Sequence, residues 1–229
     1  MALYDRDYVS PQEVGYVQES ASVDFMKKTY QLLAASMLAA AAGAYVTMPY
    51  AMAVLQYKWF IFGAELLVLF FGLSMSRGKP GLNLAMLFLF TFLTGVSLVP
   101  LLASLIGMGN GAVIGNAFLM TSVLFGALSL FAINSKTDFS SWGKPLFIIL
   151  IVVIIASLVN YFLLQSPMMH IFITAGVLIL FGFFTIYDTQ NIANGAYDSP
   201  VDAAVSLYID FLNMFTALLQ LLGIFGSDD

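Results

Sequence analysis

Two aspartates near the carboxyl end of the chain have the residue type and setting for proton chemistry. Asp188 lies in "FTIYDTQNI" at 184–192 and Asp210 lies in "SLYIDFLNMF" at 206–215, both in very apolar sequence. Two carboxylates that meet in a low-dielectric setting cannot both ionise cheaply, so they share a proton and titrate as a pair. Loss of that proton would push the two helices apart or recruit a cation such as Ca²⁺, which prefers carboxylate oxygens.

The elements that carry these aspartates are predicted to be membrane-spanning helices. The chain has 229 residues, of which 61% are hydrophobic and 9% charged, whereas soluble domains carry roughly a quarter charged residues. Apolar runs of about 18 residues can cross a hydrocarbon core about 30 Å thick as helices. The runs are apolar on every face, which disfavours a β-barrel. We therefore predict an all-α polytopic membrane protein with seven spans, at about 29–49, 59–76, 82–106, 112–133, 145–166, 168–190 and 202–225.

The count of seven depends on one short break, because only Ser166 and Pro167 separate the fifth run from the sixth. Six spans are the alternative. Residues 1–28 are polar and mixed in charge, and we predict that they form a mobile cytosolic tail. Residues 29–229 are then the transmembrane domain.

The basic residues of the loops predict the orientation of the chain. With the amino terminus inside, the outer segments hold only Lys58. Lys and Arg are enriched on the cytosolic side of membrane proteins, so we predict a cytosolic amino terminus and, with seven spans, a carboxyl terminus outside. The inner segments then hold Arg6, Lys27, Lys28, Arg77, Lys79, Lys136 and Lys144.

This topology predicts that the two aspartates meet. Asp188 lies near the inner end of the sixth span, and Asp210 lies about two turns into the seventh span from the same side. A helix rises about 1.5 Å per residue, so both lie at similar depth, and the short 193–201 turn makes the two helices antiparallel neighbours. A charged residue at mid-membrane costs about 2.5–3.5 kcal/mol, so a functional role is the default interpretation.

The seventh span also carries a polar stripe. Ser206, Asp210, Asn213 and Gln220 recur at spacings of four, three and seven, which places them on one helix face. We predict that this face looks into the bundle and that Ser206 and Asn213 contribute to an ion pathway. Hydrogen bonding between helices is the alternative role for such a stripe.

Three other ionisable residues lie in or beside the spans. Glu65 in the second span is too far from the aspartates to join them, and it either forms an outer ion site or hydrogen-bonds a neighbouring helix. Arg77 ends the second span on the inner side, where it either latches onto a carboxylate as part of an inner gate or extends to the headgroups. His170 is the only histidine, and we interpret it as a residue of the outer interface.

Several enzyme classes are disfavoured by what the sequence lacks. There is no cysteine, which excludes thiolate nucleophiles and thiolate metal sites. Intramembrane aspartyl proteases also place Tyr-Asp in one helix and Asp in the next, but their Gly-x-Gly-Asp is replaced here by Leu207-Tyr208-Ile209-Asp210. The seventh span has no lysine for a retinal Schiff base, and no phosphate-binding loop or basic patch for nucleic acid is present. We predict a protein that is not an enzyme and holds no cofactor.

The sequence resembles the Bax inhibitor-1 family, also called the transmembrane Bax inhibitor motif family. The resemblance rests on Ile186-Tyr187-Asp188-x-Gln190, on the seventh-span motif from Ser206 to Phe215, on "GVSLVPLL" at 95–102 and "AFLMTSVLFGAL" at 117–128, and on the terminal "LLGIFGSDD". It covers roughly residues 27–229.

The resemblance implies a bundle in which the other six helices enclose the carboxyl-terminal helix, with a pH-dependent calcium leak through it. Asp188 and Asp210 match the family's proton sensor, Arg77 is the nearest candidate for an arginine that pairs with them, and Glu65 matches an acidic position of the second helix. We therefore predict an inner-membrane channel that passes Ca²⁺ or other cations, with transient Ca²⁺ contacts at the aspartate pair. The alternative is a regulatory membrane protein that modulates a membrane-bound protease or another membrane protein through direct contacts.

Overall fold

Helices make up every regular element in the part of the chain that the structure describes. The computed structural model describes residues 11–225, with side chains from residue 21 to residue 224. Seven helical segments are long and apolar enough to cross a membrane, which confirms the predicted all-α polytopic class and the count of seven.

Three of the seven spans contain short 3₁₀ or π-helical turns, which interrupt the first two of these spans and lie at the ends of the third. The 3₁₀ turns are η1 and η3, and the π-helical turns are η2 and η4. In chain order the spans comprise α1 (Pro11–Thr47), η1 (Met48–Tyr50) and α2 (Ala51–Gln56); α3 (Lys58–Leu67), η2 (Val68–Gly72) and α4 (Leu73–Ser76); α5 (Pro80–Gly107); α6 (Ala112–Asn134); η3 (Ser140–Trp142), α7 (Gly143–Val159) and η4 (Asn160–Leu164); α8 (Pro167–Ala193); and α9 (Pro200–Phe225).

The short break between the fifth and sixth spans is a fixed turn. Gln165 has a left-handed backbone with φ of 48°, which ends the preceding helix. The Asn160 side chain forms two hydrogen bonds with the Ser166 backbone. Its Nδ2 donates to the Ser166 carbonyl at 3.2 Å, and its Oδ1 accepts from the Ser166 amide at 3.0 Å. Pro167 follows at the first position of α8, where a missing amide proton does no harm. These contacts separate the two helices although only two polar residues lie between the runs.

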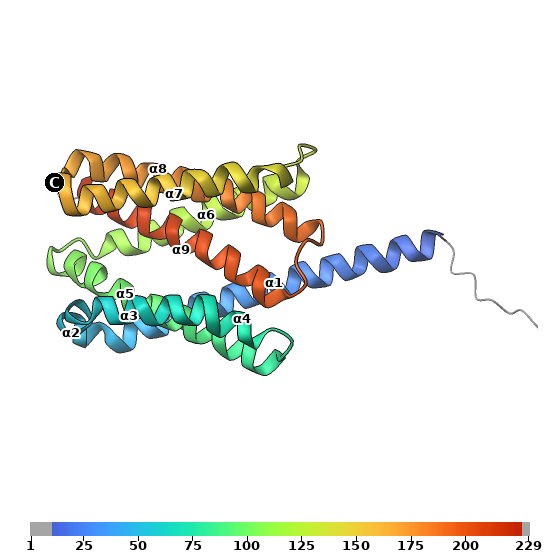
Figure 1. Ribbon diagram of the computed structural model, residues 1–229, viewed down its shortest axis with the longest axis horizontal. Coiled ribbons are helices and arrows are strands. Elements are labelled where there is room, and N and C mark those ends of the chain that lie inside the picture. Colours follow the sequence, from blue (N-terminus) through green and yellow to red (C-terminus); the bar gives the residue numbers. More distant parts are fainter. Residues whose placement is uncertain (1–10, 226–229) are drawn as a thin grey trace, which may run out of the picture.

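The first helix starts before the first apolar run. Residues 11–28 are helical and continuous with the first span, and in Figure 1 the start of α1 projects beyond the bundle. The predicted boundary at residue 28 therefore falls inside one helix. Residues 1–10 of the predicted tail lie outside the described residues, and the placement of the tail in the cytosol stays a prediction.

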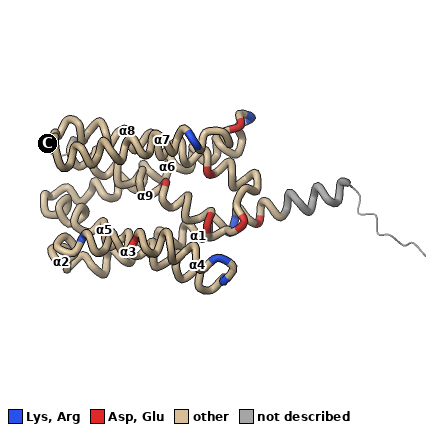
Figure 2. Tube along the Cα trace, in the orientation of Figure 1, with Lys and Arg blue, Asp and Glu red and all other residues tan. Residues whose placement is uncertain are grey.

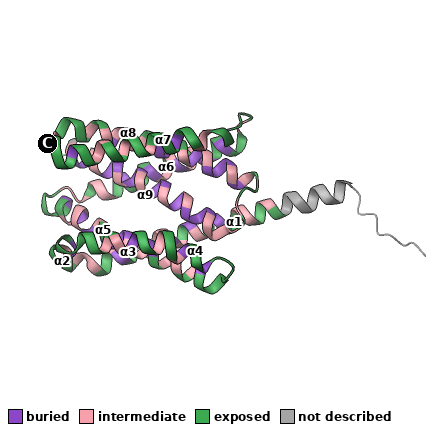
Figure 3. Ribbon diagram, in the orientation of Figure 1, coloured by how far each residue is buried: buried purple, intermediate pink, exposed green. Residues whose placement is uncertain are grey.

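The carboxyl-terminal helix α9 runs between two groups of helices (Figure 1). In one group α1 and α3 pack on α5, and in the other α6 and α7 pack on α8. α9 packs against α1, α5, α6 and α8, and it is the most buried of the seven spans (Figure 3). Enclosure of α9 by all six other spans goes further than these contacts and stays a prediction.

Glycines bring α1 and α5 into backbone contact. A Cβ atom on Gly95 would overlap the carbonyl oxygen of Ala40, and a Cβ atom on Gly43 would overlap the carbonyl oxygen of Phe92. Small residues let membrane helices approach closely enough for extensive van der Waals contact. We call this interface, formed by Ala40, Gly43, Phe92 and Gly95, the α1–α5 seam.

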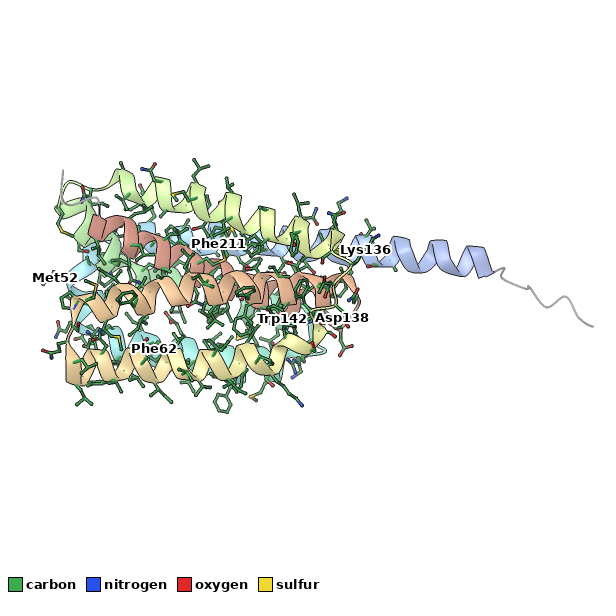
Figure 4. All side chains as sticks on the ribbon, turned by 90° about the horizontal axis from the view of Figure 1, so that it is seen from above. Met52, Phe62, Lys136, Asp138, Trp142 and Phe211 are labelled. Atoms are coloured by element: carbon green, nitrogen blue, oxygen red, sulfur yellow. The ribbon has the colours of Figure 1, made fainter. Side chains whose placement is uncertain are left out.

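The two ends of the bundle differ in charge. Basic residues of the described part lie mostly at the end from which α1 projects (Figure 2). Lys136 and Asp138 lie at this end, and Met52 lies at the opposite end (Figure 4). We call these the inner and the outer end, after the predicted orientation; which side of a membrane each faces stays a prediction.

Candidate functional site

Asp188 and Asp210 lie against each other inside the bundle. Asp188 is 8% exposed and Asp210 is 2% exposed, and on the packed helices α8 and α9 their carboxyl groups lie close enough to interact directly. The Oδ2 atom of Asp210 is buried and has no hydrogen-bond donor among the described residues. Two carboxylates facing each other offer only acceptors, so a proton held between them would supply the missing donor. The structure thus brings together the two residues that the helix geometry predicted to meet.

Tyr197, in the turn between α8 and α9, closes the site on its inner side. Its hydroxyl lies 2.9 Å from Asp188 Oδ1 and 3.0 Å from Ser206 Oγ. A hydroxyl carries one proton, so Tyr197 donates to the carboxyl group while the Ser206 hydroxyl can donate to Tyr197. Burial, and after it the negative charge of Asp188, raises the pKa of Tyr197. The tyrosine therefore stays protonated and remains a donor.

An inner cleft of about 840 Å³ reaches this tyrosine from the inner end of the bundle. Its walls come from η2, α4 and the loop after α4 on one side and from the 196–199 turn on the other, and its floor is α9. Tyr197 and Ser206 line the cleft, whereas Asp188 and Asp210 do not. The two hydroxyl groups therefore stand between the cleft and the buried pair.

Arg77 lies at this cleft but pairs with a different carboxylate from the predicted one. Its Nε lies 3.1 Å from Asp202 Oδ2, so the structure corrects the predicted contact of Arg77 with Asp188 and Asp210. The reason is depth: Asp202 lies in the first turn of α9, about 12 Å along the helix before Asp210. The guanidinium follows the end of α4 and meets the shallower carboxylate first. A role of Arg77 in gating stays a prediction.

An outer cleft of about 640 Å³ opens from the other end of the bundle. It lies between α3 on one side and α7, η4 and α8 on the other, again with α9 as its floor. His170, predicted at the outer interface, lines this cleft together with Lys58. Phe62 lies on the side of the bundle where α7 runs (Figure 4) and also lines the cleft.

One face of α9 forms the floor of both clefts. This face is partly exposed, and its residues recur every three or four positions: Asp202, Ser206 and Ile209 in the inner cleft, and Asn213, Thr216 and Gln220 in the outer cleft. The predicted polar stripe is therefore real, but it faces the two clefts rather than the packed interior. Asp210 lies at the edge of this face, about 40° around the helix from Ser206, and it is buried against α8. We call the two clefts and the floor that joins them the polar furrow.

Glu65 makes a separate buried contact. It is 8% exposed and accepts a hydrogen bond from the Ser97 hydroxyl on α5. Two roles were predicted for Glu65, and the structure contains one of them, the hydrogen bond to a neighbouring helix. Ser97 in turn lines the outer cleft. One turn away on α5, Thr94 hydrogen-bonds the buried hydroxyl of Tyr208 from α9.

Known proteins resemble the chain over most of its length. A family sequence model described as "Inhibitor of apoptosis-promoting Bax1" matches residues 23–227. The chain belongs to the Bax inhibitor-1 family. A protein of Helicobacter pylori (strain J99) is 49% identical over 231 residues, which cover 100% of both chains. The inner membrane protein YbhL of Escherichia coli (strain K12) is 32% identical over 168 residues, 69% of this chain and 70% of YbhL. Bax inhibitor 1 of Schizosaccharomyces pombe is 31% identical over 219 residues, 92% of this chain and 80% of the relative.

The α8 residues of the motif that suggested the Bax inhibitor-1 family contact several neighbouring elements at the end of the helix. Asp188 faces α9, whereas Thr189 donates to the Ser129 hydroxyl on α6 at 3.3 Å. Gln190 holds the loop between α6 and η3 with both ends of its amide: Oε1 accepts from the Phe139 amide at 2.6 Å and Nε2 donates to the Thr137 carbonyl at 2.8 Å. Asp188 is therefore positioned by a helix end that is fixed on two further sides.

Sequence reasoning missed Tyr197, Ser97 and Asp202 as members of this Bax inhibitor-1 site. Two of them, Tyr197 and Asp202, have a weak signal in the sequence. Tyr197 is the aromatic residue of the turn joining the two aspartate-bearing helices, and Asp202 lies two turns before Asp210. The described residues contain no group of three or more His, Asp or Glu side chains arranged to hold a metal ion.

Proposed function

We propose that the protein is a pH-sensitive leak channel for Ca²⁺ and other cations, controlled by the proton that Asp188 and Asp210 share. The observation that carries the proposal is the contact between these two buried carboxyl groups on neighbouring helices. The family relationship supports a multi-span membrane protein. The name of the relative YbhL, an inner membrane protein, supports placement in the inner membrane. The distribution of basic residues in the loops supports an amino terminus in the cytosol and a carboxyl terminus outside.

The polar furrow supplies the ion path in this proposal. Ser206 lies in the inner part of the path, and Asn213 lies in the outer part with Glu65 behind Ser97. Ile209 is the last α9 floor residue of the inner cleft and Asn213 the first of the outer cleft, so the barrier between them spans about one helical turn, or roughly 6 Å. Asp210 lies within that turn.

The gate follows from charge. With one proton between them, the two carboxyl groups attract each other, and α8 and α9 stay together. Without it, two negative charges face each other in a low-dielectric site, which favours separation of the helices or neutralisation by a cation. Ca²⁺ is suited to this role because it binds carboxylate and hydroxyl oxygens, and here it is cargo that makes transient contacts with Asp188 and Asp210.

Flux measurement tests the proposal directly. The purified protein is reconstituted in liposomes that contain a Ca²⁺ indicator, and influx is recorded from about pH 6 to about pH 8. We expect influx above that of vesicles without protein, with a rate that changes across this range. Vesicles that show no protein-dependent influx at any of these pH values would rule out the leak.

The aspartate pair is tested by two substitutions and a control. Asp188→Asn and Asp210→Asn remove one carboxylate each with little change in shape, so we expect both to flatten the pH response. Asp138→Asn is the matched control, because Asp138 is an exposed aspartate at the same end of the bundle. An unchanged pH profile in both pair variants would remove the pair from the mechanism.

The proposal treats the protein as a channel rather than an enzyme. The alternative of a regulatory protein predicts that a membrane protease, cross-linked to the chain in cells, changes its activity equally with the wild type and with both aspartate variants. That result, combined with absent Ca²⁺ flux, would favour regulation.

A further inference from the structure

The polar furrow is open toward the lipid along one side of the bundle. In the described part of the chain, α3 packs mainly on α5 and α7 packs mainly on α8, and these two walls share no extensive contact. The floor residues Ser206, Asn213 and Gln220 are partly exposed at the bottom of this gap. A pore for a small ion needs a polar lining but no opening to the side. Passage of a small ion therefore does not account for the opening at the side of the furrow.

The flanks and mouths of the furrow match a phospholipid. Aromatic side chains stand exposed on both walls of the outer cleft, among them Phe62 and Phe162, and they offer apolar surface to acyl chains. At the inner mouth Arg77 provides a cation and Asp198 an anion. At the outer mouth Lys58 provides a cation, and its ammonium group lies 5.6 Å from the centroid of the Trp59 ring.

These groups are complementary to a zwitterionic headgroup. The phosphate of such a headgroup pairs with arginine or lysine, and its ammonium pairs with a carboxylate or an aromatic face. Between the mouths the α9 floor offers hydroxyl and amide groups where bare hydrocarbon would offer none. A charged or strongly polar group has a high free energy in hydrocarbon without such partners.

We propose that phospholipids with a zwitterionic headgroup enter the furrow from the side and cross between leaflets along the α9 floor, with their tails remaining in the bilayer. The protein is then a lipid scramblase as well as a cation leak. The crossing requires the walls to part at the one-turn barrier between Ile209 and Asn213. No bond is made or broken, and the lipids move down their own concentration difference between leaflets.

A leaflet-exchange assay with the full chain tests this activity. Liposomes of phosphatidylethanolamine and phosphatidylglycerol carry a trace of headgroup-labelled phosphatidylethanolamine, and dithionite bleaches the label of the outer leaflet. Without exchange the inner label survives, whereas exchange brings all of it to the reagent. We expect complete bleaching in vesicles that contain the protein and protection in vesicles without it.

The floor is tested by making it apolar. We expect Asn213→Leu combined with Thr216→Val and Gln220→Leu to slow exchange about tenfold or more, which corresponds to about 1.4 kcal/mol of barrier. Ser122→Val is the control, because Ser122 lies on α6 outside both clefts and bonds only its own helix, at the Phe118 carbonyl. Exchange that persists in the triple variant would overturn the proposal.

A reversible bridge across the furrow separates lipid movement from ion movement in folded protein. The chain has no cysteine, so Phe62→Cys with Phe162→Cys provides one thiol on each wall of the outer cleft for a flexible, cleavable bifunctional reagent. We expect the bridge to stop lipid exchange, its cleavage to restore exchange, and Ca²⁺ influx to continue throughout. Exchange that continues with the bridge in place would overturn the proposal. Absence of exchange in unmodified protein that still passes Ca²⁺ would overturn it too and leave the leak intact.

Discussion

The two sides of α9 are bounded by interfaces of opposite kinds. On one side α1 and α5 meet at the α1–α5 seam, where even a methyl group has no room at Gly95. On the other side α3 and α7 stand apart across the polar furrow, and the ion pair between Arg77 and Asp202 joins one wall to the floor. At the seam the backbones of α1 and α5 contact each other directly, whereas across the furrow the contact is made by side chains.

This difference indicates which part of the bundle can move. Close contact between backbones is lost with even a small displacement, and that loss costs packing energy. We therefore expect α1 and α5 to move as one body. Exposed ion pairs and single hydrogen bonds are worth about 0–1.5 kcal/mol each, so the furrow walls can shift at little cost. Gating and lipid passage both belong on the furrow side.

The largest expected effect comes from filling the seam. Gly95→Ala should lower the free energy of unfolding by about 1–3 kcal/mol or more, because the new methyl group forces α1 away from α5. Gly63→Ala on the furrow wall α3 is the control, since nothing lies within 4 Å of a Cβ atom there. Thermal unfolding in detergent measures both. Equal stability of the two variants would show that the seam is not tight.

Loss of the Tyr197 hydroxyl should have an intermediate effect. Tyr197→Phe leaves the buried Asp188 oxygen without its donor, which should cost about 1–3 kcal/mol of stability. Tyr161→Phe, at a side chain that is 56% exposed, should cost nothing. The pKa of Tyr197 is raised in the folded state, so its contribution is present below the ordinary tyrosine value of about 10 and is lost as pH rises above it. Denaturant titrations at neutral and alkaline pH should show a smaller alkaline loss of stability in the variant than in the wild type. The same alkaline loss in both proteins would place its cause elsewhere.

The smallest effect is expected at the ion pair between Arg77 and Asp202. The Arg77 side chain is 67% exposed, so Arg77→Gln should change stability by less than about 1 kcal/mol, and by still less at high salt. Lys79→Gln, in the same loop, serves as the control for a change of net charge. A markedly larger loss in Arg77→Gln alone would mean that this pair holds the furrow closed, and the contrast with the seam would disappear.

Helix geometry explains what the sequence could predict. Span number follows from the lengths of the apolar runs, and the meeting of Asp188 with Asp210 follows from helix rise and a short connecting turn. Both are local quantities, so one chain contains them. The partner of Arg77 depends on the same arithmetic, and Asp202 would have been the better candidate on depth alone.

Other features depend on packing that a single sequence does not contain. A polar stripe on α9 looks the same in sequence whether it faces a packed interior or a cleft, so the rotation of α9 could not be inferred from spacing. Tyr197 reaches Asp188 only because the turn folds back through Gly195, whose φ is 74°. Glycines of the seam and glycines in open positions are likewise indistinguishable until the neighbouring helix is in place.

The π-helical turns give the furrow walls a property that the seam lacks. Within residues 11–225, the two π turns are η2 in the second span and η4 in the fifth, and residues of both line the clefts, among them Phe70 and Tyr161. A π turn holds one residue more than an α turn of the same rise. If that residue is released into the helix, everything beyond it turns by about 100° and advances about 1.5 Å. Release of the extra residue of η2 would turn and shift α4 in this way. Side chains at the inner end of the second span could then be re-aimed at the furrow while the seam stays still.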